Sequence, residues 1–162
     1  MSNEYEDAVR KHSEMIYRLA LAGTGNVHDA EDITQDVFLK LLNSKKAFFD
    51  DEHRKAWLIK VTVNQVKLLR RSAWFRKRNR DEIPEIADRD DLSTDTENKI
   101  VYEAVMSLKQ EMRMTVILYY YYEHSCSEIA KMTGTKEATV RTRLRRAREQ
   151  LRIILKEDFC DE

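Results

Sequence analysis

The residues best able to do chemistry are the arginines and lysines near the carboxyl end of the chain. From Lys136 to Arg148, six basic residues accompany a single acid, Glu137. Guanidinium groups bind phosphate oxygens and the edge of guanine through paired hydrogen bonds, so they offer recognition and not bond making. Six cations on one short helix repel one another unless an anion is the intended partner. The pattern therefore favours a polyanion-binding helix over a basic face that is merely solvated.

The elements that must position these cations are two short amphipathic helices, joined at Gly134, between Ser127 and Leu151. Ser125 or Ser127 can cap the first helix, and Gly134 supplies a left-handed turn residue. Thr135 is then placed to cap the second helix. This arrangement has the form of a helix-turn-helix whose second helix inserts into DNA.

The second of these helices has an apolar side and a basic side. Its core stripe consists of Val140, Leu144, Ala147 and Leu151. Arg143 and Arg148 flank that stripe, and each can either lie over it or pair with Glu149. The candidate contacts to bases and phosphates are Lys136, Thr139, Arg141, Thr142, Arg145 and Arg146.

A second basic block lies in the first half of the chain, where residues 54–80 contain 10 basic and no acidic residues, a net charge of +10. The segments on either side are acidic. Residues 1–52 hold 6 basic and 11 acidic residues, a net of −5, and residues 81–97 hold 1 basic and 8 acidic residues, a net of −7. Two basic blocks with an acidic spacer indicate two contacts on one nucleic acid, with the spacer repelled from it.

The composition predicts an all-α fold, because three glycines and one proline are too few for a sheet protein with many tight turns. No apolar run approaches the ~18 residues of a membrane span, so we expect a cytoplasmic protein with no membrane insertion. The cysteines, Cys126 and Cys160, and the four histidines show no ligand spacing, so we expect no metal and no cofactor. No arrangement of nucleophile and base supports an enzyme acting on nucleic acid.

The first half of the chain is expected to form three helices. The first runs from Tyr5 to Ala20 and is closed by Gly23 and Gly25. Asn26 can cap the second, which runs from about Val27 to Leu42. The expected buried stripe of the second helix is Ala30, Ile33, Val37 and Leu41. Its expected exposed polar residues are Asp29, Asp32, Gln35 and Asp36.

The third helix is expected from Ala56 to about Arg71. Its inward residues are Trp57, Val61, Val63 and Leu68. Its outward face carries Lys60, Asn64, Lys67 and Arg71, so the second basic block lies largely on this helix.

Residues 80–97 hold the single proline, Pro84, within a run of acidic and small polar residues that cannot bury a core. We interpret them as a flexible acidic linker between two small helical domains, residues 1–79 and 98–162. In the second domain, the four consecutive tyrosines Tyr119 to Tyr122 cannot all be buried on one helix face. Some of their hydroxyls are therefore expected at the surface or at an interface.

Three stretches of the chain match the motifs of one known family. Residues 29–38, DAEDITQDVF, fit the signature AEDxxQ(E/D)xF, and residues 56–64, AWLIKVTVN, fit aWLxxIaxN. Residues 128–151, EIAKMTGTKEATVRTRLRRAREQL, fit EIAxxLgxxxgTVksRLxRAR. Over nearly its whole length, the chain resembles a group IV, or extracytoplasmic-function (ECF), RNA polymerase sigma factor. The first two stretches resemble sigma region 2, and the third resembles sigma region 4.

The chain departs from the family pattern at three places. Lys109 stands where the family often has the proline of an LPxxxR turn, here Ser107 to Arg113. Glu123 or His124 stands where a glycine is common before the EIA motif. Leu68 stands where many members have a polar residue. These departures concern local geometry and promoter sequence and not the family.

The resemblance implies a sigma factor that binds core RNA polymerase and promoter DNA and opens the −10 element. The implied contacts to the clamp helices of the largest polymerase subunit are Asp29, Asp32, Gln35 and Asp36, and the polymerase flap is a further partner. The implied phosphate contacts at the −10 element are Lys60, Lys67, Arg70 and Arg71, with Asn64 on an unstacked base. The second helix of the helix-turn-helix would read the −35 element.

The loop from Lys45 to Arg54 resembles the segment that forms the pocket for a flipped base. It carries Phe48 and Phe49, of which Phe49 can equally be a plug into the core. The resemblance further implies a membrane-linked anti-sigma factor that covers both domains. The alternative from the residues alone is a repressor or activator that uses the helix-turn-helix by itself, with the front half as an oligomerisation module.

Overall fold

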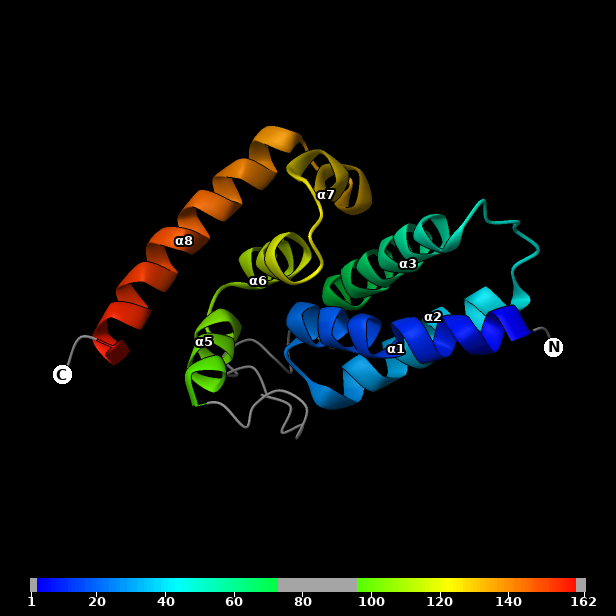
Figure 1. Ribbon diagram of the computed structural model, residues 1–162, viewed down its shortest axis with the longest axis horizontal. Helices are drawn as coiled ribbons and strands as arrows, with labels where there is room; N and C mark the ends of the chain where they lie inside the picture. The colour runs from blue at the N-terminus through cyan, green and yellow to red at the C-terminus, as the bar shows by residue number, and fades with distance from the viewer. Residues whose placement is uncertain (1–2, 73–95, 160–162) are drawn as a thin grey trace. The chain divides into compact units, whose positions relative to one another are not determined.

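The computed structural model describes residues 3–72 and 96–159, with side chains described for residues 3–72 and 99–156. The chain divides into two compact units, residues 1–82 and 83–162. The described residues are helical in both units, which confirms the expected all-α fold (Figure 1). The predicted linker lies outside the described residues except for Thr96 and Glu97, which begin a helix. Its flexibility and the exact domain boundaries stay predictions.

The first unit consists of α1 (Asn3–Thr24), α2 (Val27–Asn43) and α3 (Asp51–Arg71), and each helix contacts the other two. Figure 1 shows α1 and α2 side by side with α3 across them. Burial of a large aliphatic side chain stabilises a fold by about 1.5 to 3 kcal/mol, so the buried face fixes which faces remain outside. The fully buried large side chains are Ile16, Leu19 and Leu21 of α1, Val37 of α2, and Leu58, Ile59 and Val66 of α3.

A tight turn joins α1 to α2. Gly25 takes a left-handed conformation, with φ of 67°, and its amide donates to the Leu21 carbonyl at 2.8 Å. Asn26 then caps α2 by accepting the Asp29 amide on its side chain at 3.0 Å. Asn26 as the cap and Val27 as the first residue of α2 are therefore confirmed. The short connection brings the end of α1 next to the start of α2, as a helical hairpin requires.

The third helix differs from the prediction in its start and in its buried face. It begins at Asp51 and not at Ala56, because Asp50 caps it by accepting the His53 amide at 2.8 Å. Leu68, expected inward, is 58% exposed. Its position is two residues beyond the buried Val66, which turns it by about 200° around the helix. The buried residues of α3 are Leu58, Ile59, Thr62, Val63 and Val66.

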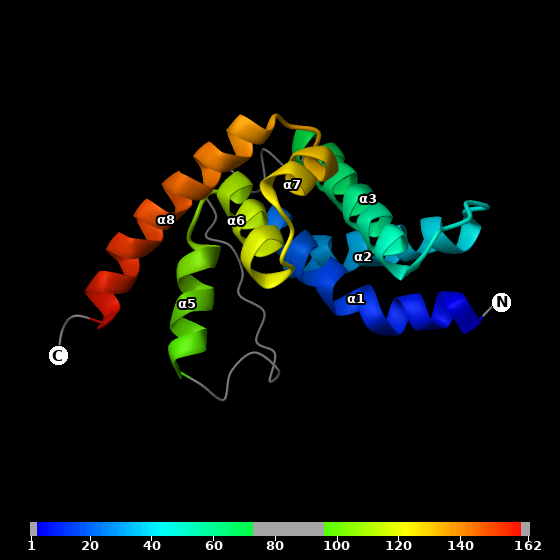
Figure 2. The ribbon, with the colours of Figure 1, turned by 45° about the horizontal axis from the view of Figure 1, so that its top comes forward.

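The second unit consists of α5 (Thr96–Met106), α6 (Gln110–Val116), a π-helical turn (Ile117–Tyr121), α7 (Cys126–Thr133) and α8 (Glu137–Phe159). Helices α5, α6 and α7 all contact α8, the long helix that Figure 2 shows spanning this unit. The π-helical turn includes the first three residues of the tyrosine run. Tyr120 and Tyr121 are exposed and Tyr119 and Tyr122 are half-buried, as expected for four consecutive tyrosines.

The helix-turn-helix is formed by α7 and α8. Ser125 caps α7 in a capping box, in which its hydroxyl accepts the Glu128 amide and the Glu128 carboxylate accepts the Ser125 amide, both at 3.1 Å. Gly134 ends α7 in a left-handed conformation, with φ of 66°. These two predictions are confirmed. The predicted cap at Thr135 is wrong: α8 begins at Glu137, and the Thr135 hydroxyl lies 2.8 Å from that of Thr133.

Arg113 closes the turn between α5 and α6. It is buried, and its guanidinium donates to the carbonyl oxygens of Leu108 at 3.0 Å and of Met106 at 3.4 Å. Lys109, which stands in the place of the family's proline, has φ of −60° and ψ of 148°. Proline adopts these angles readily, so the backbone keeps the expected turn without the proline ring.

Candidate functional site

The outer face of α2 presents an acidic and polar stripe. The side chains of Asp32, Gln35 and Asp36 are exposed, and among residues 3–72 none of the three has a hydrogen bond or ion pair. Asp29 was expected on this face, and that expectation is wrong because Asp29 is only 7% exposed. It lies in the first turn of α2, against the α1–α2 turn, where its amide donates to Asn26.

The same face of α2 continues into an apolar end that the sequence pattern did not indicate. Leu39 and Leu42 are exposed, although both are large and hydrophobic. Leu39 lies three residues beyond Asp36 and Leu42 three beyond Leu39, which places them on the side of the acidic stripe. Exposed leucines bordered by unpaired acids are typical of a protein interface.

The outer face of α3 is basic along most of its length. Lys60, Asn64 and Arg71 are exposed, as expected, and Lys67 is half-buried. The exposed Leu68 is one turn beyond Asn64 and so belongs to the same face. An apolar side chain among cations suits an unstacked base next to its phosphates.

Arg70 lies differently from its neighbours on α3. It is half-buried, and its guanidinium donates to the Gly23 carbonyl at 3.1 Å, near the end of α1. This contact satisfies one of the carbonyls that a helix leaves unpaired at its end. Arg70 is therefore less available to phosphate than the sequence predicted, and it joins α3 to α1.

The two phenylalanines before α3 point to different environments. Phe48 packs edge-on against His53 and Trp57, with ring centroids 5.5 Å apart in each pair, and the Arg54 guanidinium lies 5.4 Å from its centroid. Phe49 is 93% exposed. The plug of this loop is thus Phe48, and the alternative that Phe49 fills the core is wrong.

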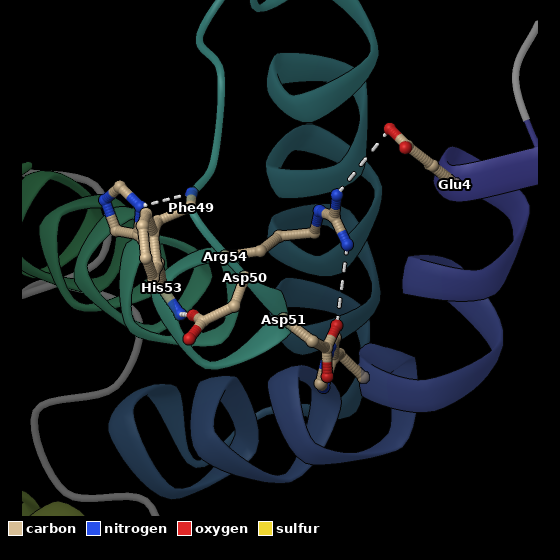
Figure 3. A network of polar contacts seen from close by, with 7 residues as sticks. Glu4, Phe49, Asp50, Asp51, His53 and Arg54 are labelled. Carbon is tan, nitrogen blue, oxygen red and sulfur yellow. Dashed lines mark hydrogen bonds and ion pairs between the residues drawn. The ribbon is translucent and has the colours of Figure 1, made fainter.

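The loop is held by polar contacts at the start of α3, which Figure 3 shows. The Phe49 amide donates to Nδ1 of His53 at 3.0 Å. Arg54 pairs with Asp51 at 3.5 Å and with Glu4 of α1 at 3.9 Å. A cavity of about 290 Å³ adjoins the inner side of the loop. It is lined by Glu4, Tyr5, Leu41, Leu42, Ser44, Lys46, Phe48 and Arg54.

On α8 the core stripe is as predicted for Val140, Leu144 and Ala147, which are buried, and Leu151 is half-buried. Of the candidate DNA contacts, Lys136, Arg141, Arg145 and Arg146 are exposed and Thr139 and Thr142 are half-buried. The Thr142 hydroxyl donates to the Ala138 carbonyl at 3.0 Å. Arg141 pairs with Glu137 one turn earlier, within the same helix.

One side of α8 borders a cavity of about 630 Å³, whose other wall comes from the start of α6. Among its lining residues are Lys109, Thr139, Thr142, Arg143 and Arg146. Two of these, Lys109 and Arg143, were not among the predicted DNA contacts. Only the packing of α6 on α8 brings Lys109 next to the arginines.

Arg148 lies on the other side of α8 and is held by tyrosines of the π-helical turn. Its Nε–H donates to the Tyr120 hydroxyl at 2.6 Å, and its guanidinium lies 5.6 Å from the ring centroids of Tyr119 and Tyr120. The hydrogen bond with Tyr120 raises the pKa of the Arg148 guanidinium. Of the two alternatives for Arg148, neither core packing nor pairing with Glu149 is realised. Tyr120 is its partner.

Comparisons with known proteins agree with this geometry. Residues 8–76 match the family model for sigma-70 region 2, and residues 98–151 match the model for sigma-70 region 4. SigV of Bacillus subtilis is 32% identical over 154 residues, which cover 93% of this chain and 91% of that protein. SigL of Mycobacterium tuberculosis, an ECF RNA polymerase sigma factor, is 30% identical over 152 residues, which cover 91% of this chain and 86% of SigL. The chain belongs to the ECF group of sigma-70 factors.

Further relatives give the same family. The ECF sigma factor SigE of Mycolicibacterium smegmatis is 32% identical over 158 residues, and the chain spans 60% of its length. Among solved structures, the sigma factor RpoE of Bartonella quintana, in complex with the anti-sigma factor NepR, has a TM-score of 0.69 at 21% identity. That match covers 96% of this chain and 98% of RpoE. CnrH, in complex with the cytosolic domain of CnrY, has a TM-score of 0.63 at 22% identity.

The two family matches identify the two units of the structure as sigma-70 region 2 and region 4. Region 2 of this ECF sigma factor contains the α2 stripe, α3 and the loop before it, and region 4 contains the helix-turn-helix. As a sigma factor, the protein directs transcription initiation by RNA polymerase. The front half of the chain matches sigma-70 region 2. This match excludes the alternative of a repressor or activator that uses the helix-turn-helix by itself. Within the described residues, no helix is long and apolar enough to cross a membrane.

Proposed function

We propose that this sigma factor reads its promoter at two places and binds core polymerase at a third. Region 4 reads the duplex −35 element, the outer face of α3 and its preceding loop capture the opened −10 strand, and the α2 stripe docks on polymerase. The protein acts in the cytoplasm as a specificity subunit and carries out no catalysis of its own. The exposed face of α3 is the observation on which the proposal depends most.

That face supports binding of a single strand. Lys60 and Arg71 supply phosphate contacts, and between them Asn64 presents an amide and Leu68 an apolar side chain, all exposed. The Asn64 side-chain amide can form hydrogen bonds with the Watson-Crick edge of a base. That edge is available only after the base leaves the stack. The exposed Phe49 lies in the loop that leads into the same helix and adds a ring on which a base can stack. The cavity behind Phe48 adjoins this loop and is a candidate pocket for a flipped base.

The α2 stripe supports docking on polymerase. Unpaired Asp32, Gln35 and Asp36 offer acceptors to a basic partner, and Leu39 and Leu42 offer apolar contact at the end of the stripe. Because Asp29 is buried, we propose that it orders the start of α2 and does not touch the clamp helices of the largest polymerase subunit. The flap is the proposed partner of region 4.

Region 4 supports recognition of duplex DNA. The exposed side chains of Arg141 and Arg145 lie four residues apart on α8. This spacing places both on one side of the helix, where they can contact neighbouring base pairs in one major groove. Lys136 and Arg146 are exposed at either end of this segment and are proposed phosphate contacts. An arginine that binds guanine with two hydrogen bonds would contribute roughly 1 to 3 kcal/mol of discrimination.

The test is run-off transcription with core polymerase and the full-length protein on candidate promoters. We expect promoter-specific transcripts, with strand opening confined to the −10 element. Duplex binding without any specific transcript would contradict the proposal.

We further propose that an anti-sigma factor holds the protein inactive. RpoE and CnrH, which share its fold, were solved with protein partners, NepR and CnrY. Two exposed basic faces would otherwise bind nucleic acid indiscriminately. Purification of the native protein from cells, with and without inducing stress, should recover a complex in one state and free protein in the other. Recovery of free protein in both states would exclude such a partner.

A further inference from the structure

His53 occupies the third position of α3 and forms a modified capping box. In an ordinary box, a Glu or Gln at this position accepts the backbone amide of the capping residue itself. Here the Asp50 carboxylate accepts the His53 amide at 2.8 Å, and the His53 imidazole accepts the Phe49 amide at 3.0 Å. The ordinary version occurs in the same protein at Ser125 and Glu128. The start of α3 thus uses an imidazole where the start of α7 uses a carboxylate.

The direction of the hydrogen bond defines the state of the ring. A backbone amide can only donate, so Nδ1 of His53 carries a lone pair and the imidazole is neutral with its proton on Nε2. In the parts of the chain with described side chains, the Phe49 amide is the one hydrogen-bond partner of this imidazole. A doubly protonated ring has two donors and no acceptor, and it cannot make this contact.

The contact orients the two phenylalanines. Phe48 forms T-shaped contacts with His53 and Trp57 and lies under the Arg54 guanidinium, while the amide of Phe49 donates to Nδ1 of His53. With Phe48 anchored and the following amide held, the side chain of Phe49 is 93% exposed to solvent.

We propose that His53 is a positioning residue for promoter opening: its neutral imidazole holds the turn that presents Phe49 to an unstacked base of the −10 element. The proposal rests on the proposed function, in which this loop contacts the opened strand.

The experiment measures the rate of −10 opening by core polymerase with the full-length protein, by fluorescence of a reporter base in the −10 element. Three variants are compared: Phe49→Ala, His53→Ala and His53→Gln. Gln retains a hydrogen-bond acceptor in its side chain. Binding to core polymerase and thermal unfolding of each variant are measured alongside, and the transcript yield from a promoter with a pre-opened −10 bubble serves as the control that needs no opening step.

We expect Phe49→Ala to slow opening about tenfold, as loss of one base–aromatic stack would. His53→Ala should slow it about fivefold, as loss of one hydrogen bond would, with core binding unchanged and with a smaller defect on the pre-opened template. His53→Gln should open at nearly the parental rate, because its side-chain oxygen can accept the Phe49 amide.

Each outcome bears on one of the two proposals. If Phe49→Ala opens the promoter normally, the loop does not contact the strand, and both the loop assignment and the role of His53 fail. If Phe49→Ala is impaired while His53→Ala is not, only the role of His53 fails. A His53→Ala defect that is equal on both templates, or a His53→Gln variant that opens as slowly as His53→Ala, would also overturn the role of His53.

Discussion

Nε2 of His12 lies 3.1 Å from Oδ1 of Asp51 and joins the buried side of α1 to the first turn of α3. His12 is buried, whereas the Asp51 side chain is 39% exposed. The contact fixes the start of α3, and with it the loop that carries Phe49. Region 2 therefore depends on a polar contact beneath its proposed DNA-binding surface.

Asp51→Asn should destabilise the protein modestly. Partial burial raises the pKa of Asp51, but the hydrogen bond and charge of His12, with the charges of Lys11 and Arg54, outweigh it and leave the pKa below its ordinary value. We expect a loss of about 0.5 to 1 kcal/mol at neutral pH, because solvent screens a half-exposed carboxylate. The measurement is urea unfolding, with Asp36→Asn as a control that should change stability by less than about 0.5 kcal/mol.

The pH dependence of this contact has a definite sign. A carboxyl whose pKa is lowered by folding stabilises the protein above its unfolded pKa, and this contribution is lost as pH falls through the folded value. The parent should therefore lose more stability than Asp51→Asn on acidification below about pH 4, the ordinary range for Asp. Parallel stability curves for the two proteins would contradict this assignment.

Asn64→Ala and Asp36→Arg should separate the two proposed surfaces of region 2. Both side chains are exposed, on different helices, so neither substitution disturbs the core. Asn64→Ala should impair opening of the −10 element and leave core affinity unchanged, because it removes a contact to a base. Asp36→Arg should lower core affinity at least tenfold, since a like charge at an interface costs more than 1 kcal/mol. Core affinity is measured by competition against another sigma factor, and equal losses in both variants would refute the assignment.

Lys109→Gln should weaken promoter binding by holoenzyme without changing sequence preference. Lys109 lines the cavity beside Arg143 and Arg146, where a phosphate of the −35 element can enter. Loss of one phosphate contact should lower the slope of log affinity against log salt by about 1. Lys99→Gln, an exposed lysine on α5, is the matched control and should leave that slope unchanged. If the slope of log affinity against log salt is the same for both variants, Lys109 does not contact DNA.

Ser125→Ala should destabilise region 4 by about 1 kcal/mol, the usual effect of losing a helix cap. The hydrogen bonds of the Ser125 amide and hydroxyl are the main cause of the lowered pKa of Glu128, so both parts of the capping box should weaken together. Ser127→Ala is the control, because Ser127 is exposed and the structure assigns the cap to Ser125. Thermal unfolding of the two variants decides the matter, and equal melting temperatures would exclude the box as a stabilising element.

Local signals in the sequence predicted several features correctly. The cap at Asn26 and the left-handed Gly134 depend on contacts within a few residues, and helical spacing alone indicates the stripe of Val140, Leu144 and Ala147. Other local predictions were wrong, since α3 begins at Asp51 and Thr135 does not cap α8. The faces of α3 were harder to assign. Helical spacing shows that an apolar stripe exists, but Leu68 and Val66 are both apolar, and only the packing of α1 and α2 selects Val66 for burial.

The sequence by itself determined the family, the all-helical fold and the two basic surfaces, because motifs, periodicity and charge are properties of the linear chain. Tertiary structure decided which side chains are available at those surfaces. Asp29 is buried, and the Arg70 guanidinium donates to the Gly23 carbonyl. Phe48 packs against Trp57, whereas Phe49 is exposed. Arg148 donates to the Tyr120 hydroxyl. Each of these outcomes depends on a partner elsewhere in the fold or on the exact start of a helix. Such contacts form only when the elements pack, so spacing along the chain does not predict them.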